Sequence, residues 1–194
     1  QGKVEDATTD PDGHLVTGGN DGRVLRWERD GTPREILAVE EPVATVRVRP
    51  DGRVVAGTQT GAVLVDGRPS PQQHEGAVTA MIVDTERIVS GGADGRLAWH
   101  PDGPVRDAGV GPIHALLHHD GALWIAGGRG LARWTRGGDG LPRGGPVLGA
   151  EAPMVALVRH DGHLILAEGD RLRRLPLDLP TRATPAGGAS PRGP

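Results

Sequence analysis

The chain has 194 residues, 36% of them hydrophobic, and a formal net charge of −3 at pH 7. A charge this small gives no general attraction to nucleic acid or anionic membranes, and no apolar run approaches the roughly 20 residues that span a bilayer. The absence of cysteine excludes disulfides and thiolate metal sites, and it leads us to expect a cytoplasmic protein.

The hydrophobic core has to be built almost without large rings, because the chain has no Phe or Tyr and only four Trp. Aliphatic side chains must therefore supply the buried area, which favours many thin apolar layers over one thick core. The 32 Gly and 17 Pro would suggest disorder if they were unpatterned, but they recur at regular positions.

Five similar segments follow one another along the chain. In each of them an apolar stretch is followed by a turn and a second apolar stretch, and the segments are Asp12–Trp27, Asp51–Val65, Arg87–Trp99, Asp120–Trp134 and Asp161–Leu175. We align them at positions 18, 57, 91, 127 and 168, which are 39, 34, 36 and 41 residues apart. This spacing is close to the roughly 40–45 residues of a four-stranded propeller blade.

The second segment illustrates the strands of one unit. Val43–Val48 is predicted as strand a, Arg53–Ala56 as strand b and Ala62–Val65 as strand c. The turn between strands a and b contains Asp51 and Gly52, and glycine accepts the positive φ that a tight hairpin requires.

Outer strand d is less regular. It is predicted at Arg34–Ala38, Val105–Ala108 and Pro146–Leu148 in the first, third and fourth units. In the second unit Arg68–Gln73 takes its place, and the prolines there are tolerated only at an outer edge because proline cannot donate to a strand ladder. The fifth unit would take its outer strand from Leu179–Thr184.

These units predict an all-β fold, a β-propeller of about five four-stranded blades. We expect the propeller domain at 1–184, with units at about 3–42, 43–76, 77–111, 112–151 and 152–184, and a flexible Gly/Pro-rich tail at 185–194. The chain begins with strand a, since Lys3–Thr9 aligns with Ala77–Val83, so no leading strand completes the last blade. Either the five blades close, or the ring is incomplete and another segment or subunit finishes it.

The repeat resembles the WD40 family over about residues 3–178, and the third unit matches best. A His-x-x-x-Val start of strand a is found at His74–Val78, and Ser90–Gly95 and Trp99 follow it. The resemblance implies WD40-like blades and a hydrogen-bonded structural network, whose members in the third unit would be His74, Ser90, Asp94 and Trp99. In the first unit the corresponding members would be Thr17, Asp21 and Trp27.

The repeats also depart from the family pattern. Only Trp27-Glu28 approaches the Trp-Asp pair, and the second and fifth units have no Trp at all. Trp99 and Trp134 lie four residues after their turn glycine, whereas Trp27 lies five after its own. Trp124 aligns with apolar residues of the other units, so we expect it in the core between blades; these residues are Leu15, Val54, Ile88 and Ile165.

Candidate catalytic and metal sites have simpler explanations. The group His114, His118, His119 and Asp120 suits zinc by residue type, but it lies along a strand a and its turn, so solvated side chains are expected. Asp10–Gly13 resembles the start of a calcium loop without the remaining ligands. No Ser lies in a nucleophile elbow and no Gly-rich stretch opens a helix. We expect no enzymatic activity, no bound metal and no cofactor.

Binding is expected on loops, which carry function on rigid scaffolds. In the WD40 family one face, made of d–a loops and b–c turns, is the common docking surface. The candidate partner-binding residues on this face are Glu40, Glu41, Gln73, Glu75, Arg129 and Asp170. Their mixed to mildly acidic character favours a basic peptide or protein surface.

We therefore expect a protein–protein interaction scaffold, one module of a larger regulatory or assembly protein of bacterial type, with no nucleic-acid or membrane partner. A small-molecule or carbohydrate-binding propeller is the alternative, and repeated pockets with the same polar groups between blades would favour it. A propeller hydrolase using the region His114–Asp120 is a third hypothesis, which a metal bound there would favour.

Overall fold

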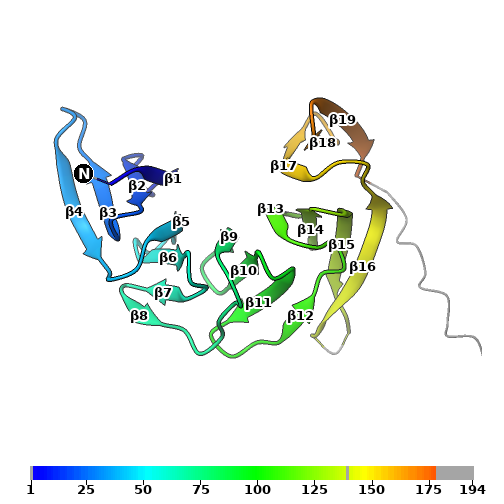
Figure 1. The fold of residues 1–194 in the computed structure, drawn as a ribbon, viewed down its shortest axis with the longest axis horizontal. Coiled ribbons are helices and arrows are strands. Elements are labelled where there is room, and N and C mark those ends of the chain that lie inside the picture. Colours follow the sequence, from blue (N-terminus) through cyan, green and yellow to red (C-terminus); the bar gives the residue numbers. More distant parts are fainter. Residues whose placement is uncertain (1, 139, 178–194) are drawn as a thin grey trace, which may run out of the picture.

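The computed structural model describes residues 2–138 and 140–177 of the chain. Within these residues nineteen strands form five antiparallel sheets. Each sheet is one blade, and in each blade the strands follow one another in chain order from the inside of the fold outward (Figure 1). The described residues contain no helix that could cross a membrane. The predicted all-β propeller architecture is confirmed.

The blades have the following strands. The first blade is built from β1 (Val4–Thr9), β2 (Leu15–Gly19), β3 (Arg23–Trp27) and β4 (Pro33–Ala38). The second is built from β5 (Val43–Val48), β6 (Val54–Thr58), β7 (Val63–Val65) and β8 (Arg68–Pro69). The third is built from β9 (Val78–Val83), β10 (Ile88–Gly92), β11 (Arg96–His100) and β12 (Val105–Asp107).

The last two blades differ in their outer strands. The fourth is built from β13 (Ile113–His119), β14 (Ala122–Gly127), β15 (Gly130–Arg136) and β16 (Pro142–Gly149), and the fifth from β17 (Met154–His160), β18 (His163–Glu168) and β19 (Arg171–Pro176). The outer strand predicted at Leu179–Thr184 and the predicted tail at 185–194 lie outside the described residues.

A glycine in strand b makes room for the first side chain of the next blade. A Cβ added at Gly91 would lie 2.6 Å from Cγ2 of Ile113, which begins strand a of the fourth blade. The first two junctions repeat this arrangement with the pairs Gly18–Val43 and Gly57–Val78, each also at 2.6 Å. The large partner is β-branched in all three junctions, so the glycine accommodates bulk close to the neighbouring backbone.

The fourth junction uses a different pair of side chains. Ala126 pairs with Ala115 in the register in which Gly91 pairs with Ala80, so alanine stands where the earlier blades have glycine. Ala126 and Met154 share one buried cluster, and methionine is unbranched at Cβ. The sequence alignment at positions 127 and 168 is therefore wrong by one residue, because the b–c turns of the last two blades are one residue shorter.

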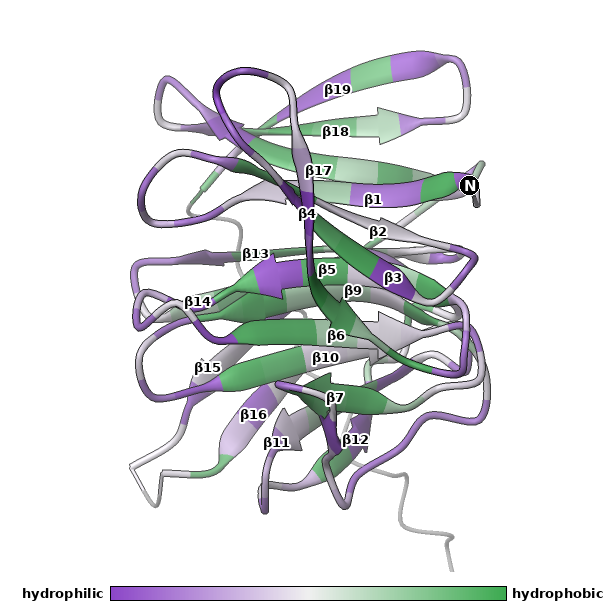
Figure 2. Cartoon of the chain, turned by 90° about the vertical axis from the view of Figure 1, so that its left-hand side faces the viewer, coloured by the Kyte–Doolittle hydropathy of each residue, from purple (hydrophilic) through white to green (hydrophobic). Residues whose placement is uncertain are grey.

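Apolar side chains fill four separate junctions between neighbouring blades. The first junction contains only aliphatic residues, whereas Trp134 contributes to the third. Trp124 is 1% exposed and lies in the fourth junction. Figure 2 shows the hydrophobic residues along the strands and mainly hydrophilic residues on the loops at both edges. The core is thus a series of thin layers.

The register of Trp124 differs from the one the sequence alignment assigns. Its pairing with Leu117 makes it equivalent to Val89, which faces the following blade, and not to Ile88, which faces the preceding blade. Successive residues of a strand point to opposite faces of the sheet, so one residue of misalignment changes the predicted neighbour. Trp124 is core between blades, as expected, but between the fourth and the fifth.

The five blades follow an arc that is open between the first and the fifth blade (Figure 1). The residue that pairs with the strand-b glycine or alanine is apolar in every blade, and in the first four blades it is 0% exposed: Val24, Val63, Leu97 and Leu131. Its equivalent in the fifth blade, Leu172, is 77% exposed. The fifth blade therefore carries the apolar face that in other blades a following blade covers.

The first blade carries the complementary uncovered face. Strand a of each later blade begins with a side chain that is 0% exposed and packs on the preceding blade: Val43, Val78, Ile113 and Met154. The equivalent Val4 is 53% exposed, and Leu15 on the same face is 45% exposed. Both ends of the arc thus keep residues suited to a neighbouring blade.

We predict that the two equivalent leucines differ sharply in their contribution to stability. In the 194-residue chain, Leu131→Ala should lower the free energy of unfolding by about 2–5 kcal/mol because it leaves a cavity. Leu172→Ala should change it by less than about 0.5 kcal/mol because the side chain is exposed. Urea denaturation measures both, and an equally large loss for Leu172→Ala would show that a blade covers this face in solution.

Candidate functional site

The d–a loops and b–c turns meet on one edge of the blades, which we call the loop edge. Backbone hydrogen bonds join each loop to the turn beside it, for example from Gln59 N to Pro42 O at 2.9 Å and from Arg129 N to Val110 O at 2.7 Å. His74 N donates to Gly61 O at 3.0 Å in the same way. These bonds fix the backbone from which the predicted partner-binding side chains project.

The structure places all six predicted partner-binding residues on the loop edge. Glu41 is half-buried, and the others are exposed: Glu40, Gln73, Glu75, Arg129 and Asp170. The hydroxyl of Thr60 donates to the Glu41 carboxylate, and this bond and one from Thr58 lower the pKa of Glu41. Glu75 pairs with Arg96 at 3.0 Å. Glu41 is thus ionised but bonded within the chain, and Arg96 partly neutralises Glu75.

The predicted network of the third blade contains His74, Ser90 and Asp94. His74 Nδ1 lies 3.1 Å from Asp94 Oδ1, and His74 Nε2 lies 2.8 Å from Ser90 Oγ. Asp94 also accepts the backbone N–H of Glu75 at 3.0 Å. The network thereby joins the d–a loop to strand b and the b–c turn.

Trp99 does not occupy the fourth place of this network, and the prediction that it does is wrong. His100 stands there instead, with Nε2 2.7 Å from Ser90 Oγ and Nδ1 2.7 Å from Ser70 Oγ. His100 pairs across the sheet with Ile88 just as Trp27 pairs with Leu15. The sequence contained the signal, because His100 lies five residues after Gly95 and Trp27 five after Gly22.

The first blade has the tryptophan version of the same contact. Trp27 Nε1 donates to Thr17 Oγ1 at 2.9 Å. Asp21 accepts the backbone N–H groups of Gly2 at 2.9 Å and Arg23 at 3.3 Å, and the first of these bonds lowers the pKa of Asp21. Thr17 and Trp27 therefore lie together as the resemblance implies, while Asp21 holds the beginning of the chain.

Trp134 is the counterpart of Trp27 in the fourth blade, because it pairs with Leu123 in the same register. The counterpart of Thr17 is Ile125, which has no acceptor for an indole N–H. Trp134 Nε1 is buried and has no hydrogen-bond partner among the described residues. Loss of the strand-b hydroxyl explains this unsatisfied donor.

The order Asp94–His74–Ser90 is also that of a hydrolytic triad. Ser90 is 0% exposed and shares its hydroxyl with His100, so a substrate carbonyl has no approach to Oγ. Burial lowers the pKa of His100 to about 4, and the nearby His74 acts in the same direction. His100 is therefore neutral near pH 7, which suits a structural chain of hydrogen bonds.

The acidic cluster near the first hairpin is closed by an arginine. Asp10, Asp12 and His14 can bring one ligand atom each to within 4.8 Å of one another. Arg26 lies among them, 2.9 Å from Asp10 Oδ2, 3.4 Å from Asp12 Oδ2 and 2.6 Å from His14 Nδ1. In the fourth blade, His119 pairs with Asp120 at 3.0 Å, and His118 lies at the opposite edge from His114, along β13.

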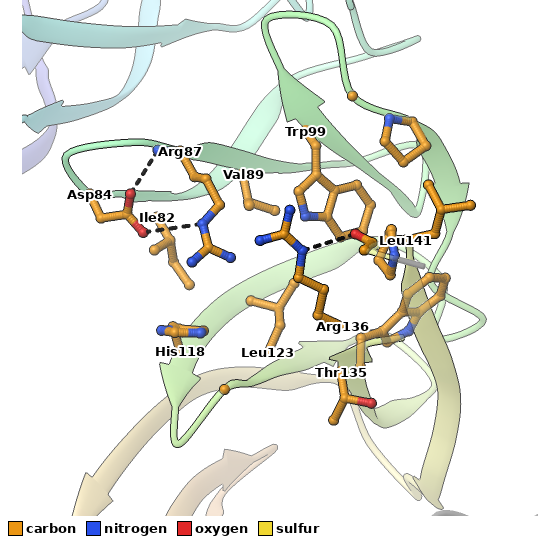
Figure 3. A pocket seen from close by; sticks show the side chains of 16 residues that line it. Ile82, Asp84, Arg87, Val89, Trp99, His118, Leu123, Thr135, Arg136 and Leu141 are labelled. Atoms are coloured by element: carbon orange, nitrogen blue, oxygen red, sulfur yellow. Dashed lines mark hydrogen bonds and ion pairs between the residues drawn. The ribbon is translucent and has the colours of Figure 1, made fainter. Parts of the chain in front are cut away.

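The edge opposite the loop edge carries the a–b hairpins, and we call it the hairpin edge. A pocket of about 230 Å³ opens there between the third and fourth blades (Figure 3). Its apolar lining includes Ile82, Val89, Leu123, Trp99 and Trp134, and Arg87, Arg136 and His118 are its basic residues. No sequence pattern indicated this pocket, because its residues come from different blades.

A second pocket occupies the equivalent junction between the first and second blades. Arg26 stands there in the register of Trp99, and Val48 in the register of His118. Its polar groups include the carboxylates of Asp10, Asp12, Asp51 and Asp66. The two pockets thus share a position and differ in their polar groups.

Comparisons with known proteins agree with the geometry. The profile of the strictosidine synthase-like N-terminal family matches residues 5–27, which is the first hairpin and the strand after it. No curated protein matches the chain.

Solved structures are similar over most of the chain. The computationally designed Ika8 protein is 20% identical with a TM-score of 0.66, over 88% of this chain and 57% of its own. The designed Ika4 protein is 22% identical with a TM-score of 0.54, over 75% and 92%. A chain of the Mitotic Checkpoint Complex is 14% identical with a TM-score of 0.70, over 86% and 57%.

These likenesses and the five sheets define the class of protein: the chain is a β-propeller protein whose five described blades form an open arc. It spans 57% of the length of the Ika8 chain and of the similar chain in the checkpoint complex.

We predict that Ile125→Thr restores the missing partner of Trp134. Threonine and valine have nearly the same shape, and a buried threonine normally costs stability relative to valine. Here the hydroxyl would accept the Trp134 indole N–H, so Ile125→Thr should unfold with a free energy about 1 kcal/mol above that of Ile125→Val. Val55→Thr is the control and should lose about 1–3 kcal/mol. The same loss at position 125 would contradict the assigned pairing.

We predict that acid weakens the fold through His100. Its folded pKa of about 4 lies below the ordinary 6.5, so the unfolded chain binds the proton more readily. The contribution of neutral, buried His100 to the free energy of unfolding is fully present above pH 6.5. It is lost as the pH falls toward 4, and the free energy of unfolding then decreases by up to roughly 3 kcal/mol. In urea titrations, His100→Gln should flatten the dependence of the unfolding free energy on pH by about one proton. An unchanged slope would contradict this assignment.

Proposed function

We propose that the chain is a WD40-like protein–protein interaction scaffold, cytoplasmic and without catalytic activity. The observation that carries the proposal is the loop edge, where backbone hydrogen bonds hold exposed charged and polar side chains from several blades. A surface of this kind is preformed, so a partner meets little cost of ordering on binding. The network of His74, Ser90 and Asp94 supports the WD40-like character.

The apolar end faces support an assembly role. Leu172 and Val158 on the fifth blade and Val4 and Leu15 on the first are exposed, although their equivalents or neighbours elsewhere lie between blades. We propose that additional blades, from another segment or another subunit, cover these faces and finish the ring. This chain covers only 57% of the Ika8 chain and of the similar chain in the checkpoint complex, so both of these chains are long enough to contain further blades.

A basic peptide or protein surface is the proposed partner of the loop edge. Glu40, Glu75 and Asp170 are exposed, and Glu41 remains ionised through its bonds to Thr60 and Thr58. Arg96 and Arg129 lie on the same edge and reduce its net negative charge. Electrostatic attraction would therefore guide and orient a basic partner more than it would tighten binding. The proposal therefore requires affinity that falls with added salt.

A small-molecule function has one observation in its favour, the pocket between the third and fourth blades. The pockets at the first and third junctions differ in their polar groups, which argues against a propeller that binds one carbohydrate at repeated sites. Burial of Ser90 argues against a hydrolase built on the His74 network.

The proposed function is tested with a labelled lysine-rich peptide and fluorescence anisotropy. Glu40→Gln, Glu41→Gln and Glu75→Gln together should weaken binding at least about tenfold, because three carboxylates are lost from the loop edge. A matched variant, with Asp12→Asn, Asp51→Asn and Asp161→Asn, removes three charges from the hairpin edge and should change the affinity less than about twofold. Equal losses in both variants would place the docking surface elsewhere.

A further inference from the structure

The pocket between the third and fourth blades combines an aromatic and aliphatic floor with two guanidinium groups. We propose that it binds a small aromatic carboxylate, with the ring on the floor and the carboxylate between Arg87 and Arg136. This inference is separate from the proposed protein-docking function, because the pocket lies on the hairpin edge and not on the loop edge.

The floor is suited to a flat apolar group. The ring centroids of Trp99 and Trp134 lie 6.0 Å apart with an angle of 40° between the planes. Ile82, Val89 and Leu123 extend this surface across the two blades. Aromatic rings associate favourably at such distances in tilted or offset arrangements, so a third ring can add to the pair.

The two arginines reach the pocket from different blades. Arg87 precedes β10, Arg136 ends β15, and Figure 3 shows both guanidinium groups directed into the space beside Leu123. Arg136 Nε donates to the carbonyl oxygen of Gly140 at 3.0 Å, which orients the group without neutralising its charge. His118 lines the same pocket.

Asp84 is the acidic residue in this lining, and its carboxylate is already engaged. Its Oδ1 accepts the backbone N–H groups of Glu86 at 2.8 Å and Arg87 at 2.7 Å. The contact from its Oδ2 to Arg87 Nε is 3.8 Å long. Asp84 is thus the one acidic residue beside two arginines in the described lining, and a bound anion would add negative charge next to both guanidinium groups.

The equivalent junctions show that this chemistry is specific to one place. Between the first and second blades, Arg26 takes the register of Trp99 and is paired with Asp10 at 2.9 Å. In the fourth blade the same register holds Arg133, whose guanidinium lies 5.4 Å from the centre of the Trp124 ring. Only the third blade, among those described, has an aromatic side chain at this position.

The volume sets the size of the ligand. About 230 Å³ is below the roughly 300–1,000 Å³ of pockets that bind drug-sized molecules. A single ring with a short acidic side chain fits this limit. Arginine pairs with carboxylate through two parallel hydrogen bonds, which would fix the acid end while the ring rests on the floor.

The test uses phenylacetate and its neutral analogue phenylacetamide as probes of the 194-residue protein. Tryptophan is the only ring fluorophore of the chain, which has no Tyr or Phe, so ligand binding near Trp99 and Trp134 should change its emission. Phenylacetate should bind at least about tenfold more tightly than phenylacetamide, because the amide cannot form charge-assisted bonds to both arginines. Equal affinity of the two probes would overturn the proposal.

Variants locate the site. Arg136→Gln and Arg87→Gln should each weaken phenylacetate binding by about tenfold. The matched control is Arg53→Gln, since Arg53 precedes β6 as Arg87 precedes β10 and its side chain is 59% exposed. It should leave the affinity unchanged, and a loss equal to that of Arg87→Gln would show that only general positive charge attracts the probe.

A peptide arm separates the two sources of an aromatic carboxylate. A tripeptide that ends in phenylalanine with a free carboxylate offers the same chemistry as part of a chain. The proposed small acid should bind at least as tightly as this peptide, because the pocket is limited to about 230 Å³. Clearly tighter binding of the peptide, lost on amidation of its end, would overturn the assignment to a small molecule and identify a peptide C-terminus as the ligand.

Discussion

Each blade of this protein can bury its two sheet faces only against the blades on either side. The contact that sets their approach is local: the first side chain of strand a packs against a strand-b position with little or no side chain. Glycine accepts Val43, Val78 and Ile113 at three junctions, and alanine accompanies Met154 at the fourth. Since any added carbon at these glycines would collide with the next blade, the junctions tolerate few substitutions.

This constraint also explains the ends of the arc. The first and the fifth blade each keep an apolar face that no described blade covers. Leu172 and Val4 are exposed on these faces, whereas the equivalent residues of the other blades are buried. Uncovered faces of this kind are typical of binding surfaces. The function proposed above gives the apolar ends a role in assembly and the polar loop edge a role in docking.

The buried polar groups follow the same register. The strand-b hydroxyl forms a hydrogen bond with the indole of Trp27 in the first blade and with the imidazole of His100 in the third. In the fourth blade the hydroxyl is absent, and the Trp134 indole N–H has no partner among the described residues. The neighbouring strand-c position lies on the other face of the sheet and holds Arg26, Trp99 or Arg133 in these three blades. In the third blade Trp99 occupies it and points into the junction, where it forms part of the pocket with Arg87 and Arg136.

The amino-acid sequence by itself determined the repeat, strands a to c of each unit and the tight hairpin turns. These features depend on residues close together in the chain, such as alternating apolar side chains and Asp-Gly turns, where Gly52 indeed has a φ of 85°. The resemblance of the third unit to the WD40 pattern also implied that His74, Ser90 and Asp94 belong to one network, and they do lie together.

Tertiary structure alone decided which side chains face which blade. Successive side chains of a strand point to opposite faces, so an alignment error of one residue assigned Trp99 to the network place that His100 occupies and Trp124 to the wrong neighbouring blade. The pocket could not be predicted either, since Arg87 and Arg136 are brought together by the packing of two blades. The open arc was decided at the same level, because closure depends on the angle between neighbouring blades and not on the composition of any one of them.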